Sequence, residues 1–310
     1  MQRFTSFNIY TLLLCYPLLW TDSLVHRPLK PHSIHNFYNS RSLRSNYTDT
    51  SISYEACDTS AFRITYQAAG SSWLLNAKSL HDDEMIGVGQ VSTGNSNDGW
   101  LLKTDRYGNV LWSMDYGSSQ NDFLQGVIHT SDGGFLAVGS VQNPGPTPTG
   151  VSGYGWALKT DAGGKVIWSY KLNIAPSQIQ RACETKDGYV LIASINLPGA
   201  FSGIIIVKIN NNGSLQWMKE YSSGTSDAGY DIKQTTDGNF VISGFVFGLG
   251  AGSHDGLLMK VSAKDGSLLW FKTYGSTGDD VIDCFDEDNQ GNLYLSLYWG
   301  VDNEVSIVKT

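Results

Sequence analysis

The sequence predicts an all-β fold, a five-bladed β-propeller of four-stranded antiparallel blades. Three observations predict it: four regularly spaced tryptophans, two phrases that recur beside them, and an unusual composition. The 310 residues are only 16% charged but include 34 Gly, 9 Trp and 16 Tyr. Because Lys, Glu and Arg fill exposed helix faces, their shortage favours short strands and turns over helices.

The repeat consists of two phrases that alternate along the chain. The tryptophans lie 56, 49 and 53 residues apart and are Trp112, Trp168, Trp217 and Trp270. Each belongs to a phrase of the type WLLKTDRYGNVLW, and a second phrase of the type TSDGGFLAVGS follows. Together the phrases give four short apolar runs separated by Gly, Asp and Asn, which are typical turn residues. Four strands in about 50 residues are typical of a propeller blade.

The ends of the chain predict how the ring closes. The predicted blades cover residues 73–116, 122–172, 177–221, 227–274 and 280–310. The last unit lacks an outer strand. Residues 62–66 supply one, because they repeat the pattern of residues 112–116 with Phe62 in place of the tryptophan. Such closure removes the last open sheet edges. The alternative is that the chain is a fragment of a larger ring and that the match is accidental.

The N-terminal segment predicts export. Residues 9–20 are almost wholly apolar, but they are too few to span a bilayer, which needs about 20 residues. They fit the apolar core of a signal peptide covering residues 1–23. We therefore expect a secreted or cell-surface protein with no transmembrane span in the mature chain, and a lipid anchor at Cys15 is the minor alternative. Residues 24–61 are expected to form a polar linker ahead of a propeller at 62–310.

Charge and motif content argue against several classes of partner. A formal net charge of −8 disfavours a nucleic-acid partner, which would need a basic face. Cys57, Cys183 and Cys284 lie far apart, so buried free thiols are favoured over a single bridge, and a zinc ribbon is excluded. The sequence contains no GxSxG, HExxH or CxxCH motif and no glycine-rich phosphate loop. We therefore expect no metal and no cofactor.

The two phrases resemble the bacterial-type β-propeller repeat proteins. Written out, they are W-x-x-K-x-D-x-x-G-x-x-x-W-x-x-x-Y-G and T-x-D-G-G-F-x-x-x-G. The likeness covers residues 62–310 and implies a secreted or cell-surface chain with quinoprotein-like blade repeats. It implies no activity, because that family is largely of unknown function. A quinoprotein dehydrogenase is disfavoured, since those enzymes have eight blades and a vicinal cysteine pair.

The repeated residues belong first to packing. Large rings fill the space between neighbouring blades, and this role is assigned to Trp112, Trp168, Trp217, Trp270 and Phe62. A lysine also recurs at one position of every unit, as Lys103, Lys159, Lys208, Lys260 and Lys309. A ring of lysines would suit an anionic ligand. We favour instead pairing with the turn acids that follow in two units, Asp105 and Asp161.

Candidate ligand contacts lie on the inner strands, which face the axial funnel of a propeller. Six residues before the turn acid of the first four units stand Asn76, Gly126, Arg181 and Asp231, and Asp283 is taken as their equivalent in the fifth. A second polar layer holds Ser79, His129, Glu184, Gln234 and Glu287. We expect a ligand in the funnel to meet Arg181, Asp231 and Asp283. Further candidates are Asn76, His129 and Trp299, the last in an exposed loop. The alternative is that these groups bind axial water and neighbouring backbone.

Three functions remain open. The leading hypothesis is a monomeric, non-enzymatic binding module that takes a glycan or protein ligand at the cell surface through loops on one face. The rival is a carbohydrate-active hydrolase using Asp231, Asp283 and Glu184, which needs two carboxylates roughly 5–10 Å apart. The third is a purely structural cell-surface spacer. A regular ring without a nucleophile, metal cluster or cofactor motif favours the first.

Overall fold

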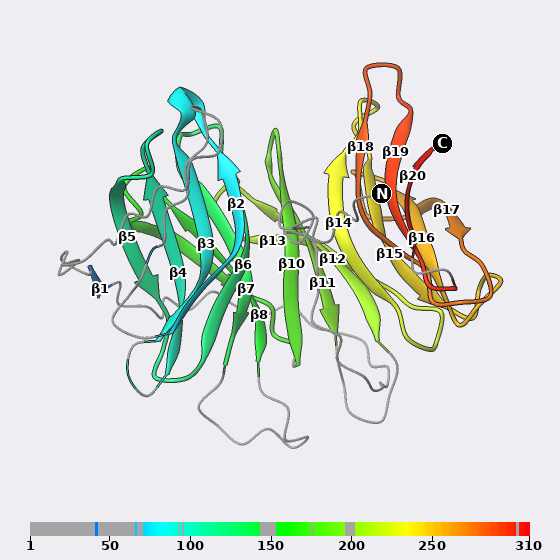
Figure 1. Cartoon of the computed structure of the whole chain (residues 1–310), viewed down its shortest axis with the longest axis horizontal. Coiled ribbons are helices and arrows are strands. Elements are labelled where there is room, and N and C mark those ends of the chain that lie inside the picture. Colours follow the sequence, from blue (N-terminus) through cyan, green and yellow to red (C-terminus); the bar gives the residue numbers. More distant parts are fainter. Residues whose placement is uncertain are drawn as a thin grey trace, which may run out of the picture.

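The computed structural model describes residues 41–42, 66, 71–92, 94, 96–142, 153–174, 176–195, 202–301 and 304–310. Apart from one 3₁₀ turn at His81–Asp83, all regular structure in these ranges is β-strand, which confirms the all-β prediction. The strands form five antiparallel sheets that lie side by side in an arc (Figure 1). We call these sheets blades 1 to 5 in chain order.

Each blade is a meander in which consecutive strands pair, starting with the inner strand. Blade 1 contains β2 (Ser72–Ser79), β3 (Met85–Ser92), β4 (Asn97–Thr104) and β5 (Val110–Tyr116). Blade 2 contains β6 (Asp122–His129), β7 (Phe135–Val141), β8 (Tyr154–Thr160) and β9 (Val166–Lys171). Blade 3 contains β10 (Ser177–Thr185), β11 (Gly188–Ile195), β12 (Gly203–Asn210) and β13 (Leu215–Tyr221). Blade 4 contains β14 (Ala228–Gln234), β15 (Phe240–Phe247), β16 (His254–Val261) and β17 (Leu268–Tyr274). Blade 5 contains β18 (Val281–Glu287), β19 (Leu293–Trp299) and β20 (Glu304–Lys309).

These sheets agree with the five predicted units, and the ends of the chain add two observations. The short strand β1 (Arg41–Ser42), from the expected linker, pairs with β5 and adds a fifth strand to blade 1. Blade 5 has three strands among the described residues. The outer strand expected at 62–66 lies outside those residues except for Tyr66. The structure therefore shows five blades, and closure of the ring stays a prediction.

A one-residue bulge interrupts the pairing of every inner strand. The extra residues are Leu75, Gln125, Gln180, Tyr230 and Asp283. In blades 1, 2 and 4 a glycine of the second strand faces the residues beside the bulge, and these glycines are Gly89, Gly139 and Gly244. A Cβ added to Gly139 would lie 2.0 Å from the carbonyl oxygen of Phe123, and the other two glycines have even less room. The two strands thus approach more closely than a side chain permits.

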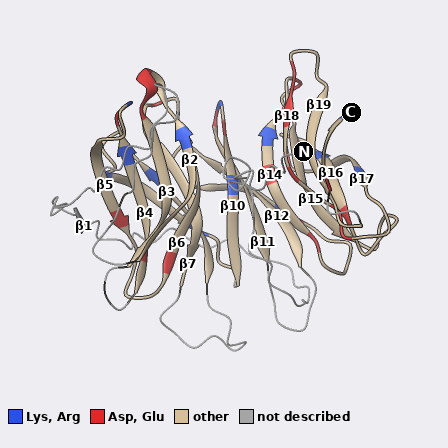
Figure 2. Cartoon of the chain, viewed as in Figure 1, with Lys and Arg blue, Asp and Glu red and all other residues tan. Residues whose placement is uncertain are grey.

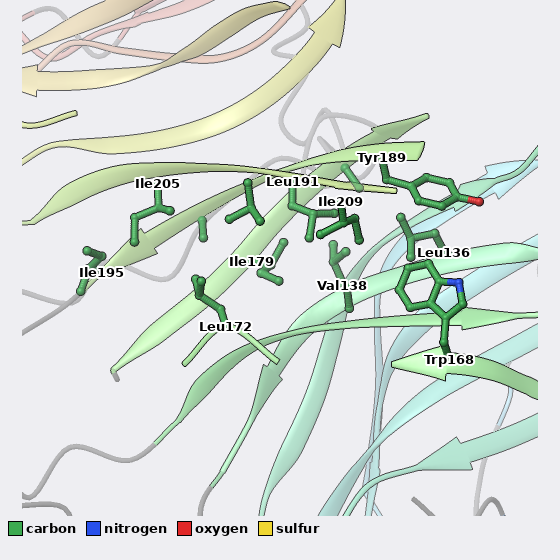
Figure 3. Close-up of a cluster of buried hydrophobic side chains, with 14 residues drawn as sticks. Leu136, Val138, Trp168, Leu172, Ile179, Tyr189, Leu191, Ile195, Ile205 and Ile209 are labelled. Carbon is green, nitrogen blue, oxygen red and sulfur yellow. The ribbon is translucent and has the colours of Figure 1, made fainter. Parts of the chain in front are cut away.

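The apolar core lies between the blades. Each of the four largest clusters joins the second and third strands of one blade to the inner strand of the next. Figure 3 shows the cluster between blades 2 and 3, where Leu136 and Val138 of β7 lie near Ile179 of β10. All three side chains are at most 1% exposed. Burial of these faces is the main favourable contribution to folding.

The repeated tryptophans lie at these junctions. Each packs in or against one inter-blade cluster, and they are Trp112, Trp168, Trp217 and Trp270. Two of them also bind a turn of the following blade through the indole nitrogen. Trp112 Nε1 donates to the carbonyl oxygen of Ala162 at 3.2 Å, and Trp168 Nε1 to that of Asn211 at 2.8 Å. Their expected counterpart, Phe62, lies outside the described residues.

The repeated lysines pair with acids, but not with the expected ones. The pairs are Lys103–Glu84 (2.6 Å), Lys159–Asp132 (2.9 Å), Lys208–Asp187 (2.6 Å), Lys260–Asp237 (2.7 Å) and Lys309–Asp288 (3.8 Å). The prediction of Asp105 and Asp161 was wrong, because a third-strand lysine lies beside the turn between the first two strands. In blade 2, for example, Lys159 pairs in register with Leu136, the second residue of β7. Asp161 instead accepts hydrogen bonds from backbone N–H groups of its own turn.

Candidate functional site

A cavity of about 730 Å³ lies where the five inner strands meet. Its apolar wall includes one residue from each inner strand, all at one register position: Ala77, Val127, Ala182, Ile232 and Phe285. Small-molecule sites in proteins usually measure about 300–1,000 Å³. The cavity therefore has the size of a ligand site, and its position on the axis agrees with the funnel expected from the repeat.

The register corrects one predicted alignment. Cys284 pairs with Ser296 as Asp231 pairs with Ser243, so Cys284 and not Asp283 is the equivalent of Asp231. Asp283 is the extra residue of the bulge in β18. A bulge redirects the side chain of its extra residue, and Asp283 lines the cavity together with Cys284. The alignment was wrong by one residue, although the carboxyl still reaches the cavity.

Two carboxyls and one guanidinium lie together in the cavity wall. Asp231 of β14 and Asp283 of β18 are partly buried, and burial raises the pKa of both carboxyls, that of Asp283 to about 6. The guanidinium of Arg181 on β10 opposes this effect at both carboxyls, so it lies within electrostatic range of each. Arg181 Nη1 also donates to the carbonyl oxygen of Gln180 at 2.8 Å. Three residues singled out in the sequence thus line one cavity.

Sequence reasoning missed three further charged residues of the wall: Lys78, Lys233 and Asp286. Lys233 Nζ and Asp286 Oδ1 form an ion pair at 2.8 Å between blades 4 and 5. The hydrogen bond from Lys233 is the main cause that lowers the pKa of Asp286, and the ammonium group of Lys78 on β2 adds a smaller effect, so blades 4, 5 and 1 contribute to one electrostatic environment. All three occupy one register position, two residues beyond that of Asp231. Because side chains alternate along a strand, a search at spacing two would have found them.

Asn76 contributes a buried acceptor to the wall. Its side chain is 8% exposed, and Oδ1 accepts no hydrogen bond from the described residues. A buried acceptor without a donor costs free energy of about 1–3 kcal/mol. A donor supplied from the cavity would remove this cost, so Asn76 is suited to contact a ligand.

The acids of the second polar layer hold neighbouring blades together. Glu184 accepts hydrogen bonds from the backbone N–H of Ser131 at 2.8 Å and from its hydroxyl at 2.7 Å. Glu287 accepts from the backbone N–H of Thr236 in the same way, at 2.8 Å. Each acid thus binds the inner hairpin turn of the preceding blade. This role occupies the Glu184 carboxylate that the hydrolase hypothesis would use.

The last two predicted contacts lie at the rim of the cavity and beyond it. His129 is exposed at the end of β6, with its ring centroid 6.1 Å from that of His81. The sequence places Trp299 in an exposed loop, but it is the last residue of β19 and packs against the cluster between blades 4 and 5. That expectation of a loop was wrong because β19 continues to Trp299, which pairs with Glu304.

Two of the cysteines line the cavity wall without forming a disulfide. They are Cys183 and Cys284, in agreement with the preference for unbridged thiols at these two positions. Burial raises the pKa of Cys183 to about 12, which keeps it protonated and unreactive at neutral pH. Cys57 lies outside the described residues.

Acids with opposite pKa shifts predict how stability depends on pH. Burial raises the pKa of Asp122 and of Asp283 to about 6, whereas hydrogen bonds from Asn292 lower that of Asp288 to about 2. The two acids with a raised pKa make their full contribution to the stability of the fold below their ordinary pKa. This contribution is lost as the pH rises through about 6. The contribution of Asp288 is present above its ordinary pKa and is lost as pH falls toward 2.

We therefore expect a higher thermal unfolding midpoint at about pH 5 than at pH 7.5, and a fall below about pH 4. A series of melting curves between pH 3 and pH 8 checks this. The change Asp283→Asn should reduce the gain between pH 7.5 and pH 5. Equal midpoints at these two values would contradict the assignment of the raised pKa values.

The described ranges lack two kinds of structural feature. None of their helices has the length and apolar character needed to cross a membrane. No group of three or more His, Cys, Asp or Glu side chains in the same ranges is arranged to hold a metal ion. The predicted signal peptide at 1–23 lies outside them.

Comparisons with known proteins identify no family. No protein-family model matches the chain, and no curated protein matches its sequence. Solved structures do resemble it. A protein of unknown function from Bacteroides caccae is 12% identical with a TM-score of 0.48, covering 78% of each chain.

Two further solved structures have similarly low identity. The Dos1 propeller is 13% identical with a TM-score of 0.46, and the match covers 77% of this chain and 58% of that one. A gluconolactonase from Xanthomonas campestris is 12% identical with a TM-score of 0.38, covering 78% of this chain and 88% of that one. At these identities and TM-scores the likenesses carry no argument about function, and membership of the β-propeller repeat family stays a prediction.

Proposed function

We propose that the protein is an exported, non-enzymatic binding module that holds a glycan in the axial cavity. One observation carries the proposal: the charged side chains that differ from blade to blade converge on a cavity of about 730 Å³. The residues that repeat in every blade pack between the blades. The residues that do not repeat are not needed for this packing and can bind a ligand. Figure 2 shows basic residues on β2, β10 and β14 beside acidic residues on β14 and β18.

The chemistry of the wall suits a ligand with many hydroxyl groups. Each hydroxyl both donates and accepts hydrogen bonds. Asp231, Asp283 and Asn76 offer acceptors, and Arg181 and Lys78 offer donors. The cationic and anionic side chains of the wall nearly balance, which favours a neutral ligand over a strongly charged one. Sugars satisfy these conditions and can also rest on the apolar wall.

An array of immobilised oligosaccharides, followed by titration calorimetry with the best binder, tests the proposal. The change Arg181→Ala should weaken binding about 10- to 100-fold, because it removes hydrogen bonds from a charged group. The matched control Lys264→Ala removes an exposed charge in the turn between β16 and β17 and should leave affinity within about 2-fold. An array without binders, or binding insensitive to Arg181→Ala, would refute a glycan site in the cavity.

The hydrolase remains the second candidate because of one observation. Asp231 and Asp283 line one cavity, and both have raised pKa values. A carboxyl with a pKa near 6 is suited to general acid catalysis at neutral pH. Any oligosaccharide that binds should then be cleaved, with loss of cleavage in Asp283→Asn. If an oligosaccharide binds and no reducing ends are released, the hydrolase hypothesis is refuted and the non-enzymatic role is supported.

We also propose that residues 62–66 close the ring as the outer strand of blade 5. The hydroxyl of Tyr66 donates to the carbonyl oxygen of Gly108 at 2.7 Å. The hydroxyl of Tyr116, which ends the outer strand of blade 1, donates to Gly164 of blade 2 in the same way, at 2.6 Å. Tyr66 thus contacts blade 1 as the last residue of a preceding outer strand would. This contact supports closure.

A further inference from the structure

The axial cavity ends sharply at the bulges of the inner strands. On β2, β10 and β14 the first residue after the bulge lines the cavity, and these residues are Asn76, Arg181 and Asp231. On β18 the bulge residue Asp283 itself lines it. None of the described residues that precede a bulge on the five inner strands does so. The cavity thus extends from the bulges toward the last residues of the inner strands.

The opening of the cavity lies at the last residues of these strands. Asn76, next to the bulge of β2, is 8% exposed, whereas Lys78, two residues further along the same strand, is exposed. At the level of Lys78, the side chains of Lys233 and Asp286 are 40% and 80% exposed. The arrowheads of β2 and β14 mark this end of the molecule (Figure 1). A ligand that enters here passes the charged side chains first and reaches Asn76 last.

Glutamine side chains join blades 2 and 3 at the other end of the cavity. Gln125 Nε2 donates to Gln180 Oε1 at 2.8 Å and to the carbonyl oxygen of Ile179 at 2.9 Å. Gln125 Oε1 accepts in turn from Gln178 Nε2. A Cβ added to Gly126 would lie 3.0 Å from the carbonyl oxygen of Gln180, so β6 and β10 are in direct contact at this level. Three amides thus form a hydrogen-bonded network where the cavity ends.

Tyr230 holds the bulge position of blade 4 at the same level. Burial raises the pKa of its hydroxyl, and the carboxylate of Asp283 raises it further, so Tyr230 lies within electrostatic range of blade 5. Its ring centroid lies 5.7 Å from that of Phe245. The bulge residue of blade 1 is the apolar Leu75. A chain that passed along the whole axis would have to break the glutamine network and displace Tyr230.

We propose that the cavity is closed at this level and takes the terminal sugar of a glycan chain, with Asn76 Oδ1 accepting a hydrogen bond from a hydroxyl of that sugar. The inference rests on the glycan site proposed above and adds the class of ligand, a chain end rather than an internal segment. Asn76 is suited to this contact because its Oδ1 is buried and accepts no hydrogen bond from the described residues. A sugar hydroxyl supplies the missing donor.

Four forms of the best-binding oligosaccharide test the proposal by titration calorimetry. One is unmodified, one has its reducing end reduced to an alditol, one carries methyl ethers on its non-reducing terminal sugar, and one carries both changes. At least one singly modified form and the doubly modified form should bind about 10-fold more weakly or worse, because a blocked end loses its hydrogen bonds at the closed end. The singly modified form that loses affinity identifies the end that enters.

Two other results separate this inference from the proposed function. If the doubly modified form binds within about 2-fold of the unmodified one, the site recognises an internal segment. The inference is then overturned, while the glycan site stands. If no oligosaccharide binds at all, the glycan site itself is refuted, and the inference with it.

The change Asn76→Leu tests the contact at the closed end. Replacing a buried acceptor that lacks a donor by an apolar group of similar shape should leave the thermal unfolding midpoint unchanged or higher. The variant should bind the unmodified oligosaccharide about 10-fold more weakly. It should change the affinity for the end-blocked form by less than about 2-fold, because that form has already lost the contact.

The matched control is Ser79→Ala at the exposed end of the same strand, where Ser79 does not line the cavity. It should leave all four affinities within about 2-fold. Equal weakening of the unmodified and end-blocked forms by Asn76→Leu would overturn the proposal, because Asn76 would then not contact the chain end.

Discussion

Replacing Gly139 by alanine should destabilise the protein strongly. The new Cβ would lie 2.0 Å from the carbonyl oxygen of Phe123 and 2.8 Å from the Cα of Leu124. Neither backbone atom can move without shifting β6, which carries Leu124 into the core between blades 1 and 2. We expect a loss of about 3 kcal/mol or more, seen as a fall of roughly 6–12 °C in the unfolding midpoint.

Blade 3 offers the matched control. Ala193 pairs with Ile179 at the register position where Gly139 pairs with Leu124. The inner strand of blade 3 therefore stands far enough away to admit a methyl group. The change Ala193→Gly should cost only about 1 kcal/mol, through greater freedom of the unfolded chain. Equal effects of the two changes would show that the close approach at Gly139 is not a constraint on the fold.

Replacing Lys159 by methionine should give the second large effect. Lys159 is almost fully buried, and its Nζ binds Asp132 at 2.9 Å and the carbonyl oxygen of Thr160 at 2.9 Å. Removing one partner of a fully buried ion pair costs about 3–5 kcal/mol. Because the Asp132 side chain is 55% exposed and can be hydrated, we expect a smaller loss of about 2 kcal/mol. Chemical denaturation of the variant and of the unchanged protein measures it.

Lys309 is the control for this prediction, because it occupies the same position of blade 5. Its side chain is 52% exposed and its Nζ lies 3.8 Å from Asp288. The change Lys309→Met should leave stability nearly unchanged, because this exposed pair is hydrated and long. Similar losses at Lys159 and Lys309 would mean that burial does not set the strength of these pairs.

The blades could be predicted from the sequence because each contains its own turn signals. The DG turns place Gly133 and Gly238 at φ angles of 83° and 82°, a conformation that only glycine adopts easily. Such signals are local, so they appear within a few residues of the strands that they connect. Arg181, Asp231 and Asp283 could be assigned to the axis for the same reason, since all three precede such a turn on an inner strand.

The contacts between strands could not be predicted in this way. The ion-pair partner of Lys159 depends on which residue of β7 lies opposite the lysine. The sequence of the turn that follows Lys159 does not determine this register. The bulge at Asp283 shifts the register of β18 by one residue, so the sequence alone did not show that Cys284 is the equivalent of Asp231. The positions compared in the sequence lie three and six residues before each turn, and Lys233 was therefore missed. Because side chains alternate along a strand, Lys233, two residues after Asp231, lies on the same face of β14.

The order of strands within the blades has a consequence for folding. Every described sheet pairs strands that follow one another in sequence, with the exception of β1. Contacts of short sequence separation form early, so we expect each meander to form before the blades associate. In the proposed closed ring, contacts between the first and last blades would span nearly the whole propeller, and closing so long a loop carries a larger entropic cost. Until such closure, the edge of β20 that no described strand covers could pair with another chain, which makes the interval before closure the stage most exposed to aggregation.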